Sequence, residues 1–302
     1  MSPEHIVMND LDRGRIDTII RFALKEDIQT GDITSNAVID KFDNVDAVIL
    51  SRGKGVVCGM EIAERVFTAV DPTLRFRPAV KDGDHIEPDQ EIAFVEGKAR
   101  SVLKGERTAL NFLALLSGVS TATREMVDAV SGTGVKIYDT RKTVPLHRYL
   151  QKYAVTVGGG YNHRRGLWDM VLIKDNHLRI CAMRKKSADN AAIIREIVRE
   201  ARSSVQKNIR VEIEVENLKE CEAALEEKPD VIMLDNMAPD QVKRAVELRK
   251  GKGLEKAVLF EVSGGIDLDN IGDYARAGAD IISTGSITTA KPLDYSLEII
   301  MK

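Results

Sequence analysis

Short apolar runs recur at regular intervals from residue 135 onward, and this alternation constrains the fold more than any other feature of the chain. The runs lie at residues 135–139, 171–174, 211–215, 231–235, 258–262 and 281–284. Segments with apolar residues on one helical face lie between most of them, at residues 190–201, 218–227, 241–250 and 270–277. Strands that are apolar on both faces and alternate with helices are typical of a parallel sheet covered by helices. The pattern predicts either a TIM-like α/β barrel or a doubly wound α/β sheet.

The residues at the carboxyl ends of these runs favour the barrel. Nearly every run ends in a charged residue or leads into glycine, and these ends are Asp139, Lys174, Glu214, Asp235, Ser263-Gly264-Gly265 and Gly285-Ser286. In TIM barrels the active residues come from the carboxyl ends of several different strands. We therefore expect a TIM-like barrel in this part of the chain.

The first third of the chain has a different pattern. A helical spacing of apolar residues at 15–24 is followed by short strand-like runs at 45–50, 56–58 and 91–95, which glycine-containing turns separate. A long helical stretch follows at about residues 100–130. This part of the sequence predicts a smaller α/β domain.

Composition excludes several classes of protein. Of the 302 residues, 43% are hydrophobic and 30% are charged, which is enough apolar material for a full core. The net charge of −3 argues against a general nucleic-acid binder. The three cysteines have no metal-ligand spacing, no apolar run reaches the roughly 18 residues of a membrane span, and residues 1–10 lack the apolar core of a signal peptide. We expect a cytoplasmic enzyme.

Positive charge is concentrated between residues 141 and 177. Seven Lys and Arg residues face two Asp residues in this stretch, a local net charge of +5 in an acidic chain. Several of these cations lie beside glycine turns or strand ends, and Lys174 directly follows an apolar run, where a solvated lysine is not expected. Clustered Arg and Lys side chains bind carboxylates and phosphates through charge-assisted hydrogen bonds. The stretch predicts an anion-binding pocket.

Two glycine loops follow the last two apolar runs. Ser263-Gly264-Gly265 and Thr284-Gly285-Ser286 each precede a helical segment. Glycine lets backbone N–H groups approach an anion closely, and the last two strands of a βα barrel are where this fold commonly holds a phosphate. These loops predict a phosphate site.

Carboxylates end two neighbouring runs, at Glu214 and Asp235. In a basic pocket such groups bind sugar hydroxyls or a divalent metal, and they also form simple ion pairs. Glu212 and Glu216 share a strand face with Glu214, so the pattern alone does not choose among the three. Arg107, near the start of the long helix, has the pattern of an ordinary surface arginine.

Taken together, these residues resemble the quinolinate phosphoribosyltransferases (carboxylating nicotinate-nucleotide pyrophosphorylases). The resemblance covers essentially the whole chain in order. Its main motifs are Asp139-Thr140-Arg141-Lys142-Thr143, Gly158-Gly159-Gly160-Tyr161-Asn162-His163-Arg164 and Leu172-Ile173-Lys174-Asp175-Asn176-His177, with further matches at residues 26–35, 106–118, 211–217, 234–236, 263–265 and 284–286.

The resemblance implies a two-domain subunit. Residues 1–115 would form an α/β sandwich domain, to which the tail at 290–302 returns, and residues 116–289 would form an open, TIM-like α/β barrel. It also implies a homodimer or higher homo-oligomer, in which Arg107 reaches the neighbouring subunit's active site. The expected partners are small-molecule substrates, with no nucleic acid and no membrane.

The implied reaction moves the phosphoribosyl group of phosphoribosyl diphosphate to quinolinate with decarboxylation, in NAD biosynthesis. It would give nicotinate mononucleotide, CO₂ and diphosphate, with Mg²⁺ as cofactor. The implied quinolinate ligands are Arg107, Arg141, His163, Arg164 and Lys174. The implied catalytic groups are Lys142, near the diphosphate, and Glu214 and Asp235, at the ribose and, directly or through water, at Mg²⁺. The two glycine loops, Ser263-Gly264-Gly265 and Thr284-Gly285-Ser286, would take the 5-phosphate.

The chain departs from the family pattern in one loop. The family usually has Thr-Thr-Pro-Gly-Leu-Arg after the Arg-Lys pair, whereas this chain has Thr143-Val144-Pro145-Leu146-His147-Arg148. Replacing that glycine with Leu146 changes the backbone conformations that the loop adopts at low cost.

Three alternatives remain open on the sequence. One is a related transferase that acts on another aromatic acid, and the departure from the family pattern at residues 143–148 is the observation that supports it. Another is a TIM-barrel aldolase or lyase that uses Lys174 as a Schiff-base nucleophile, which requires a desolvated lysine with a lowered pKa. A non-catalytic sensor of phosphoribosyl ligands is the third, and the full set of charged residues disfavours it.

Overall fold

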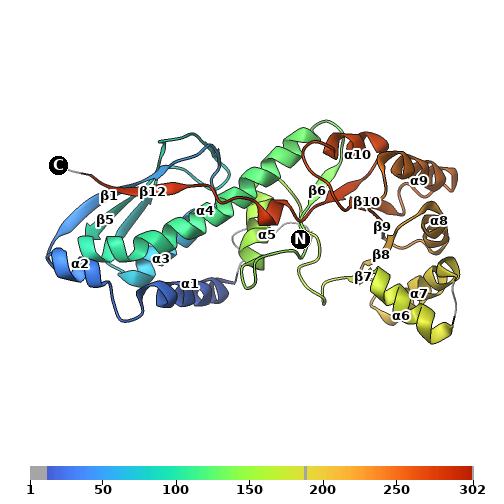
Figure 1. Ribbon diagram of the computed structural model, residues 1–302, viewed down its shortest axis with the longest axis horizontal. Coiled ribbons are helices and arrows are strands. Elements are labelled where there is room, and N and C mark those ends of the chain that lie inside the picture. The colour runs from blue at the N-terminus through green and yellow to red at the C-terminus, as the bar shows by residue number, and fades with distance from the viewer. Residues whose placement is uncertain (1–11, 187–188, 301–302) are drawn as a thin grey trace. The chain divides into compact units, whose positions relative to one another are not determined.

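The structure, a computed structural model, describes residues 12–186 and 189–300 (Figure 1). The expectation that residues 1–10 hold no signal peptide, and the last two residues of the predicted tail, lie outside the described residues. The chain forms two compact units. The first contains the residues up to Arg124, then Thr143–Gly159 and the chain from Ile287 on, and the second contains Glu125–Lys142 and Gly160–Ser286. Among the described residues, no helix combines the length and apolarity needed to cross a membrane.

The first unit is built on a four-stranded antiparallel sheet with the order β12-β1-β5-β3. Its strands are β1 (Asn44–Ser51), β3 (Arg75–Pro78), β5 (Glu91–Lys98) and β12 (Tyr295–Ile300). A small second sheet pairs β2 (Gly55–Val56) with β4 (His85–Ile86). The partner of β1 on one side is therefore the C-terminal strand, which returns to the N-terminal sheet.

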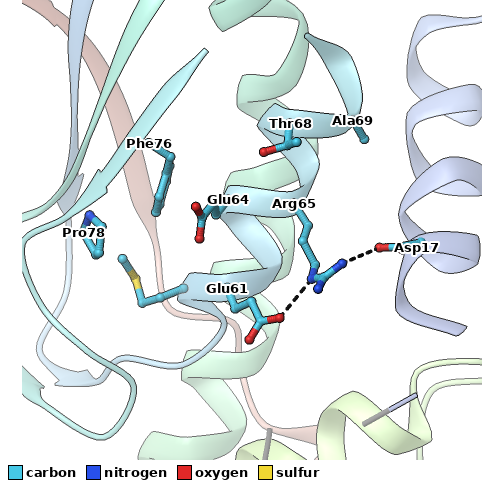
Figure 2. Close-up of a pocket in the computed structure, with 9 residues that line it drawn as sticks. Asp17, Glu61, Glu64, Arg65, Thr68, Ala69, Phe76 and Pro78 are labelled. Carbon is cyan, nitrogen blue, oxygen red and sulfur yellow. Dashed lines mark hydrogen bonds and ion pairs between the residues drawn. The ribbon is translucent and has the colours of Figure 1, made fainter. Parts of the chain in front are cut away.

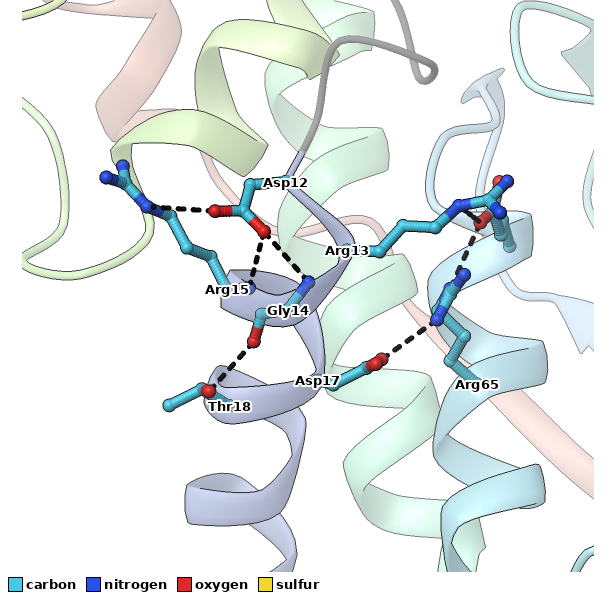
Figure 3. A network of polar contacts seen from close by, with 8 residues as sticks. Asp12, Arg13, Gly14, Arg15, Asp17, Thr18 and Arg65 are labelled. Atoms are coloured by element: carbon cyan, nitrogen blue, oxygen red, sulfur yellow. Dashed lines mark hydrogen bonds and ion pairs between the residues drawn. The ribbon is translucent and has the colours of Figure 1, made fainter.

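Helices complete this unit: α1 (Arg13–Ile28), α2 (Ile33–Val38), α3 (Met60–Val70), most of α4 (Ala99–Ala129) and α5 (Arg148–Val157), with a 3₁₀ turn at Ile287–Thr289. Polar contacts fasten α1 to α3 (Figure 3). Asp12 caps α1 by accepting hydrogen bonds from the backbone N–H groups of Gly14 and Arg15. Arg65 of α3 bridges Glu61 of its own helix, at 3.0 Å, and Asp17 of α1, at 2.9 Å.

The second unit contains a six-stranded parallel sheet with the order β6-β11-β10-β9-β8-β7. The strands are β6 (Lys136–Tyr138), β7 (Val171–Ile173), β8 (Val211–Val215), β9 (Val231–Asp235), β10 (Leu259–Ser263) and β11 (Ile281–Ser283). Five strands are neighbours in chain order, and β6 then pairs with the last of them. A doubly wound sheet reverses direction near its middle, whereas this order runs one way around and stays open between β6 and β7. The open barrel is confirmed, and the doubly wound alternative is wrong.

Helices on the outside connect the barrel strands (Figure 1). They are α6 (Asp175–Lys185), α7 (Asn190–Ser204), α8 (Leu218–Glu227), α9 (Pro239–Gly251) and α10 (Ile271–Ala277). The last four match the predicted helices closely, as the six strands match the apolar runs. No helix was predicted at the positions of α2, α3, α5 and α6. The apolar face of α6 is small, because Leu178 is its one buried residue, so the helix carried little periodic signal.

The two units divide the chain differently from the expected boundary between residues 115 and 116. Residues 116–124, 143–159 and 287–289, which were expected in the barrel, group with the first unit. The segment 143–159 is thus an excursion from the barrel after β6. Within the first unit, Tyr153 of α5 donates a hydrogen bond to Asp82, at 2.7 Å.

Leu146 lies in a tight turn at the start of this excursion. The backbone N–H of His147 donates to the carbonyl of Val144, at 3.1 Å, with Pro145 and Leu146 between them. Leu146 has a φ of 67°, the left-handed conformation that glycine adopts freely at the third position of a type II turn. The loop therefore keeps the backbone shape that the family's glycine permits, although a leucine occupies the position.

Substituting Leu146→Gly should stabilise the protein. The left-handed conformation costs a non-glycine residue roughly 1–2 kcal/mol, and glycine removes this cost. The unfolded chain is more flexible with glycine, which lowers the net stabilisation by about 0.5–1 kcal/mol. The Leu146 side chain is 82% exposed, so little packing is lost. We expect a net gain of about 0.5–1 kcal/mol in urea unfolding. Leu167→Gly, at a 73% exposed leucine without positive φ, is the control and should give no gain. Equal behaviour of the two variants would contradict the strain at Leu146.

Candidate active site

The carboxyl ends of all six barrel strands lie at one edge of the sheet, because the strands are parallel and in register. This edge carries most of the expected site residues of the second unit, and the other two, His163 and Arg164, lie between β6 and β7. The residues at the edge are Arg141 and Lys142 after β6, Lys174 after β7, Glu214 in β8, Asp235 at the end of β9, Ser263 at the end of β10 with Gly264 and Gly265 after it, and Thr284, Gly285 and Ser286 after β11. The fold therefore brings to one edge residues that are far apart in the sequence.

Lys174 and Glu214 form an ion pair at this edge. The Lys174 ammonium group donates a hydrogen bond to Glu214 Oε2, and the Glu214 side chain is 10% exposed. Burial raises the pKa of Glu214, the Lys174 ammonium opposes that rise, and repulsion from Asp235 adds to it. Glu214 and Asp235 are therefore close enough to repel each other at the ends of adjacent strands.

Asp139 organises the cationic segment that follows the barrel's first strand. Its buried carboxylate accepts hydrogen bonds from the backbone N–H of His163, at 2.8 Å, and from the Asn162 side chain, at 2.9 Å. This holds Arg164, which is only 8% exposed, next to the segment that carries Arg141. Burial lowers the pKa of Arg164, and the nearby positive charge of Arg141 lowers it further. A buried guanidinium group that a second, half-buried one repels favours a bound anion between them.

The two glycine loops require their glycines for different reasons. Gly264 has a φ of 99°, and a Cβ there would lie 2.2 Å from Asn236 Oδ1. A Cβ on Gly285 would lie 2.8 Å from Cδ of Lys142, so this glycine lets the lysine stem cross the loop. In the same loop the hydroxyls of Thr284 and Ser286 lie 2.9 Å apart.

Some expected site residues lie in the other unit. Arg107 is on α4 in the first unit and is exposed. Arg148 and Lys152, which contributed to the predicted basic pocket, are on α5 in the first unit. The basic stretch therefore divides between the two units.

A buried cluster beneath the barrel edge was missed by the sequence analysis. His163 Nε2 lies 3.1 Å from Glu212 Oε2 and 3.6 Å from Glu261 Oε1, and both glutamates are 1% exposed. Glu212 was considered only as a neighbour of Glu214. A sequence signal existed, because a glutamate inside an apolar strand, such as Glu261 in β10, needs a partner when buried.

A groove on the first unit has the wrong charge for the expected substrates (Figure 2). It has a volume of about 640 Å³ and lies on α3. The charged residues that line it, among those the structure describes, are three carboxylates, Asp17, Glu61 and Glu64, and one basic residue, Arg65. A net negative groove repels carboxylates and phosphates. We therefore place the candidate active site at the barrel edge.

Comparison with known proteins shows the family of the chain. The family "Quinolinate phosphoribosyl transferase, C-terminal domain" matches residues 119–298, and its N-terminal domain matches residues 32–117. The chain belongs to the quinolinate phosphoribosyl transferase family. The probable nicotinate-nucleotide pyrophosphorylase [carboxylating] of Methanocaldococcus jannaschii is 38% identical to it, with 93% of this chain and 96% of the relative covered. The nicotinate-nucleotide pyrophosphorylase [carboxylating] of Mycobacterium leprae is 39% identical, with 93% and 95% covered.

Solved structures of quinolinate phosphoribosyl transferases share the fold. The structure of the nicotinate-nucleotide pyrophosphorylase from Francisella tularensis matches with a TM-score of 0.87 at 37% identity, and it covers 98% of this chain and 99% of its own. The family and the fold are therefore established for this chain. The assignment of individual residues to substrates stays a prediction.

Replacing the loop glycines with alanine should separate backbone strain from steric clash. Gly265→Ala introduces only the left-handed strain of a φ of 60°, and should cost about 1 kcal/mol in urea unfolding. Gly264→Ala adds the clash with Asn236, so its cost should be higher, at about 2–4 kcal/mol. Gly251→Ala, at the end of α9 with open space around it, is the control and should be neutral. Equal costs at Gly264 and Gly265 would mean that Asn236 moves away freely.

Proposed function

We propose that this chain catalyses phosphoribosyl transfer from phosphoribosyl diphosphate to quinolinate, with decarboxylation to nicotinate mononucleotide. The observation that carries the proposal is the barrel edge, where the buried guanidinium group of Arg164, the half-buried one of Arg141, strand-end carboxylates and two glycine loops lie together. Membership of the quinolinate phosphoribosyl transferase family supports it. The product set is nicotinate mononucleotide, CO₂ and diphosphate.

The cations at the barrel edge suit a dicarboxylate. Quinolinate carries two negative charges, and Arg164 and Arg141 offer planar guanidinium groups that match carboxylate geometry. Lys174 adds a third positive charge from the end of β7. The two glycine loops on β10 and β11 suit the 5-phosphate, because backbone N–H groups there have close access to an anion.

The chemistry needs charge stabilisation more than acid–base catalysis. The pyridine nitrogen forms a bond to C1 of the ribose while the bond from C1 to the diphosphate oxygen breaks, and positive charge develops on the sugar. The carboxylates of Glu214 and Asp235 would stabilise that charge. Lys142, beside the glycine loop at Gly285, would neutralise the departing diphosphate. The bond between C2 of the pyridinium and its carboxylate carbon then breaks to release CO₂, its electron pair stays on C2, where the adjacent positive nitrogen stabilises it, and a proton from water bonds to C2.

Mg²⁺ fits the donors at the ends of β8 and β9. Carboxylate oxygens are its preferred protein ligands, and the mutual repulsion of Glu214 and Asp235 is relieved by a cation. When bound with phosphoribosyl diphosphate, Mg²⁺ would neutralise charge on the diphosphate. The two carboxylates would hold it directly or through water.

Arg107 and the oligomer form a separate part of the proposal. Arg107 is an exposed cation on the first unit. We propose that the protein is a homodimer or a larger homo-oligomer in which Arg107 completes the quinolinate site of a neighbouring subunit.

The Schiff-base alternative is disfavoured by the surroundings of Lys174. A nucleophilic lysine needs a free lone pair, which desolvation or neighbouring cations promote. Lys174 instead donates a hydrogen bond to Glu214 in an ion pair, and its partner in that contact is an anion, not a cation.

The purified chain should release labelled CO₂ from carboxyl-labelled quinolinate only when phosphoribosyl diphosphate and Mg²⁺ are both present. The expected mechanism couples carboxylate loss to formation of the pyridinium, so omitting either component should abolish release. Scintillation counting of trapped CO₂ measures it, and nicotinic acid in place of quinolinate is the control for non-specific release. No release in the complete mixture would overturn the proposed function.

Mixing two inactive variants tests whether the site is shared between subunits. A mixed dimer of Arg107→Ala and Lys174→Ala subunits contains one intact site if Arg107 acts across the interface, so activity should recover to roughly half of wild type per mixed dimer. The control pair is Arg141→Ala with Lys174→Ala, both on the barrel, which should not recover. Absence of recovery in verified mixed dimers of the first pair would show that Arg107 does not act in trans.

A further inference from the structure

The side chain of Gln151 joins two segments of the chain that are far apart in the sequence. Gln151 lies on α5 in the first unit and is fully buried. Its amide oxygen accepts a hydrogen bond from the backbone N–H of Val144, at 2.8 Å. Its amide nitrogen donates a hydrogen bond to the backbone carbonyl of Thr288, at 2.6 Å. A single planar group therefore holds two stretches of backbone together.

Both stretches lead directly to predicted site residues. The chain passes from the second unit to the first after Lys142 and again after Ser286. Val144 and Thr288 are each the second residue beyond one of these crossings, and two residues of extended chain span at most about 7 Å. The link between Val144 and Thr288 therefore restricts how far Lys142 and Ser286 can move apart.

The first stretch is fixed at each of its residues. The backbone N–H of Lys142 donates to Thr140 Oγ1, at 3.0 Å. Thr143 Oγ1 accepts a hydrogen bond from Arg148 Nε on α5, at 3.1 Å. Val144 follows and is held by Gln151. A displacement of Val144 would therefore be passed on to Lys142, because the residues between them have little freedom to absorb it.

The second stretch is held in the same way and meets the first inside the barrel unit. The backbone N–H of Ser286 donates to Thr284 Oγ1, at 3.2 Å. A Cβ on Gly285 would lie 2.8 Å from Cδ of Lys142, so the lysine stem packs against this loop. The two stretches thus touch beside the predicted phosphate site, and Gln151 joins them again two residues further on.

The two hydrogen bonds require an amide at this position. Val144 offers a donor and Thr288 an acceptor, so the oxygen of the side chain faces the first and the nitrogen the second. A carboxylate would keep the bond to Val144 but would place a second acceptor against the Thr288 carbonyl. Methionine, which has a similar length, would make neither bond.

Building on the proposed function, we propose that Gln151 is a positioning residue for phosphoribosyl diphosphate. In that function Lys142 binds the diphosphate and the loop at Ser286 binds the 5-phosphate, which are the two ends of one substrate. Gln151 sets the spacing between these two phosphate sites by joining the backbone segments that follow them. It acts through the segments and not by contact with the substrate.

The spacing of two sites matters for a ligand that binds both. Once one end of such a ligand is bound, the second end binds as an intramolecular event, and the gain in affinity depends on how well the distance between the sites matches the ligand. A ligand that occupies only one of the sites has no such gain. Loss of the link at Gln151 should therefore weaken the whole substrate and spare its halves.

Binding measurements with three ligands test this role. Gln151→Met should raise the dissociation constant of phosphoribosyl diphosphate roughly tenfold or more. The dissociation constants of ribose 5-phosphate and of diphosphate with Mg²⁺ should stay within about twofold of wild type, because each occupies one site. Isothermal titration calorimetry on the full-length chain measures all three. Equal weakening of the three ligands, or an unchanged affinity for phosphoribosyl diphosphate, would overturn the proposal.

Ser120→Ala is the matched control. The Ser120 hydroxyl donates to the Ala154 carbonyl of α5, at 2.9 Å, and both residues are fully buried. The variant therefore loses a buried hydrogen bond to the same helix without altering either stretch of backbone. All three dissociation constants should match those of wild type.

A second variant and an exchange measurement cover the case in which Gln151→Met does not fold. Gln151→Glu keeps the bond to Val144 and loses the bond to Thr288, so it should also weaken phosphoribosyl diphosphate and spare the two halves. Amide hydrogen exchange should show a protected Val144 N–H in wild type and in Gln151→Glu. Rapid exchange of this amide in wild type would contradict the proposal.

Failure of this inference can be told from failure of the proposed function. Release of CO₂ by the wild-type chain, together with an unchanged affinity of Gln151→Met for phosphoribosyl diphosphate, would overturn the positioning role alone. Binding that depends on Gln151 as expected, without any CO₂ release from quinolinate, would overturn the proposed reaction and support the positioning role. A wild-type chain that does not bind phosphoribosyl diphosphate would overturn both.

Discussion

The parallel register of six strands is the constraint on which the candidate site depends. Pairing places Glu214 beside Met233 and Ser263 between Asp235 and Ser283, so the carboxyl ends line up along one edge. A slip of one residue would turn every side chain of a strand to the opposite face. Glu212 and Glu214 would then face the outer helices together. The apolar residues that alternate with the glutamates of β8 therefore determine where its charges lie.

At the carboxyl ends of the barrel strands, oppositely charged side chains form contacts with each other that substrate groups would replace in the proposed function. Lys174 forms an ion pair with Glu214 in the ligand-free protein, and the negative charge of Glu212 stabilises the positive charge of Arg164. In the proposed function, a substrate carboxylate binds Lys174 and the ribose binds Glu214. The ion pair thereby gives the largely buried carboxylate of Glu214 a partner before substrates arrive, because a buried charge without a partner would be costly. Binding of both substrates is then linked through one ion pair.

The barrel and its edge residues could be predicted from the sequence, because apolar strands, amphipathic helices and strand-end charges are local signals. Two features could not. The position of α5 in the first unit depends on tertiary contacts such as that of Tyr153 with Asp82, which leave no local pattern. The buried contact of Glu212 with His163 joins residues 49 positions apart in the chain, and no local pattern indicates it. The left-handed Leu146 was visible only as a departure from a family pattern, since leucine gives no sign of positive φ.

The return of β12 to β1 has a consequence for the order in which the chain can fold. During synthesis, β1, β3 and β5 emerge first, yet the sheet they form lacks its outer strand until residues 295–300 have been made. All six barrel strands precede that point, since β11 ends at Ser283. The unit that begins first is thus completed last, and the edge of β1 stays open to other strands for the whole time in which the barrel is being synthesised.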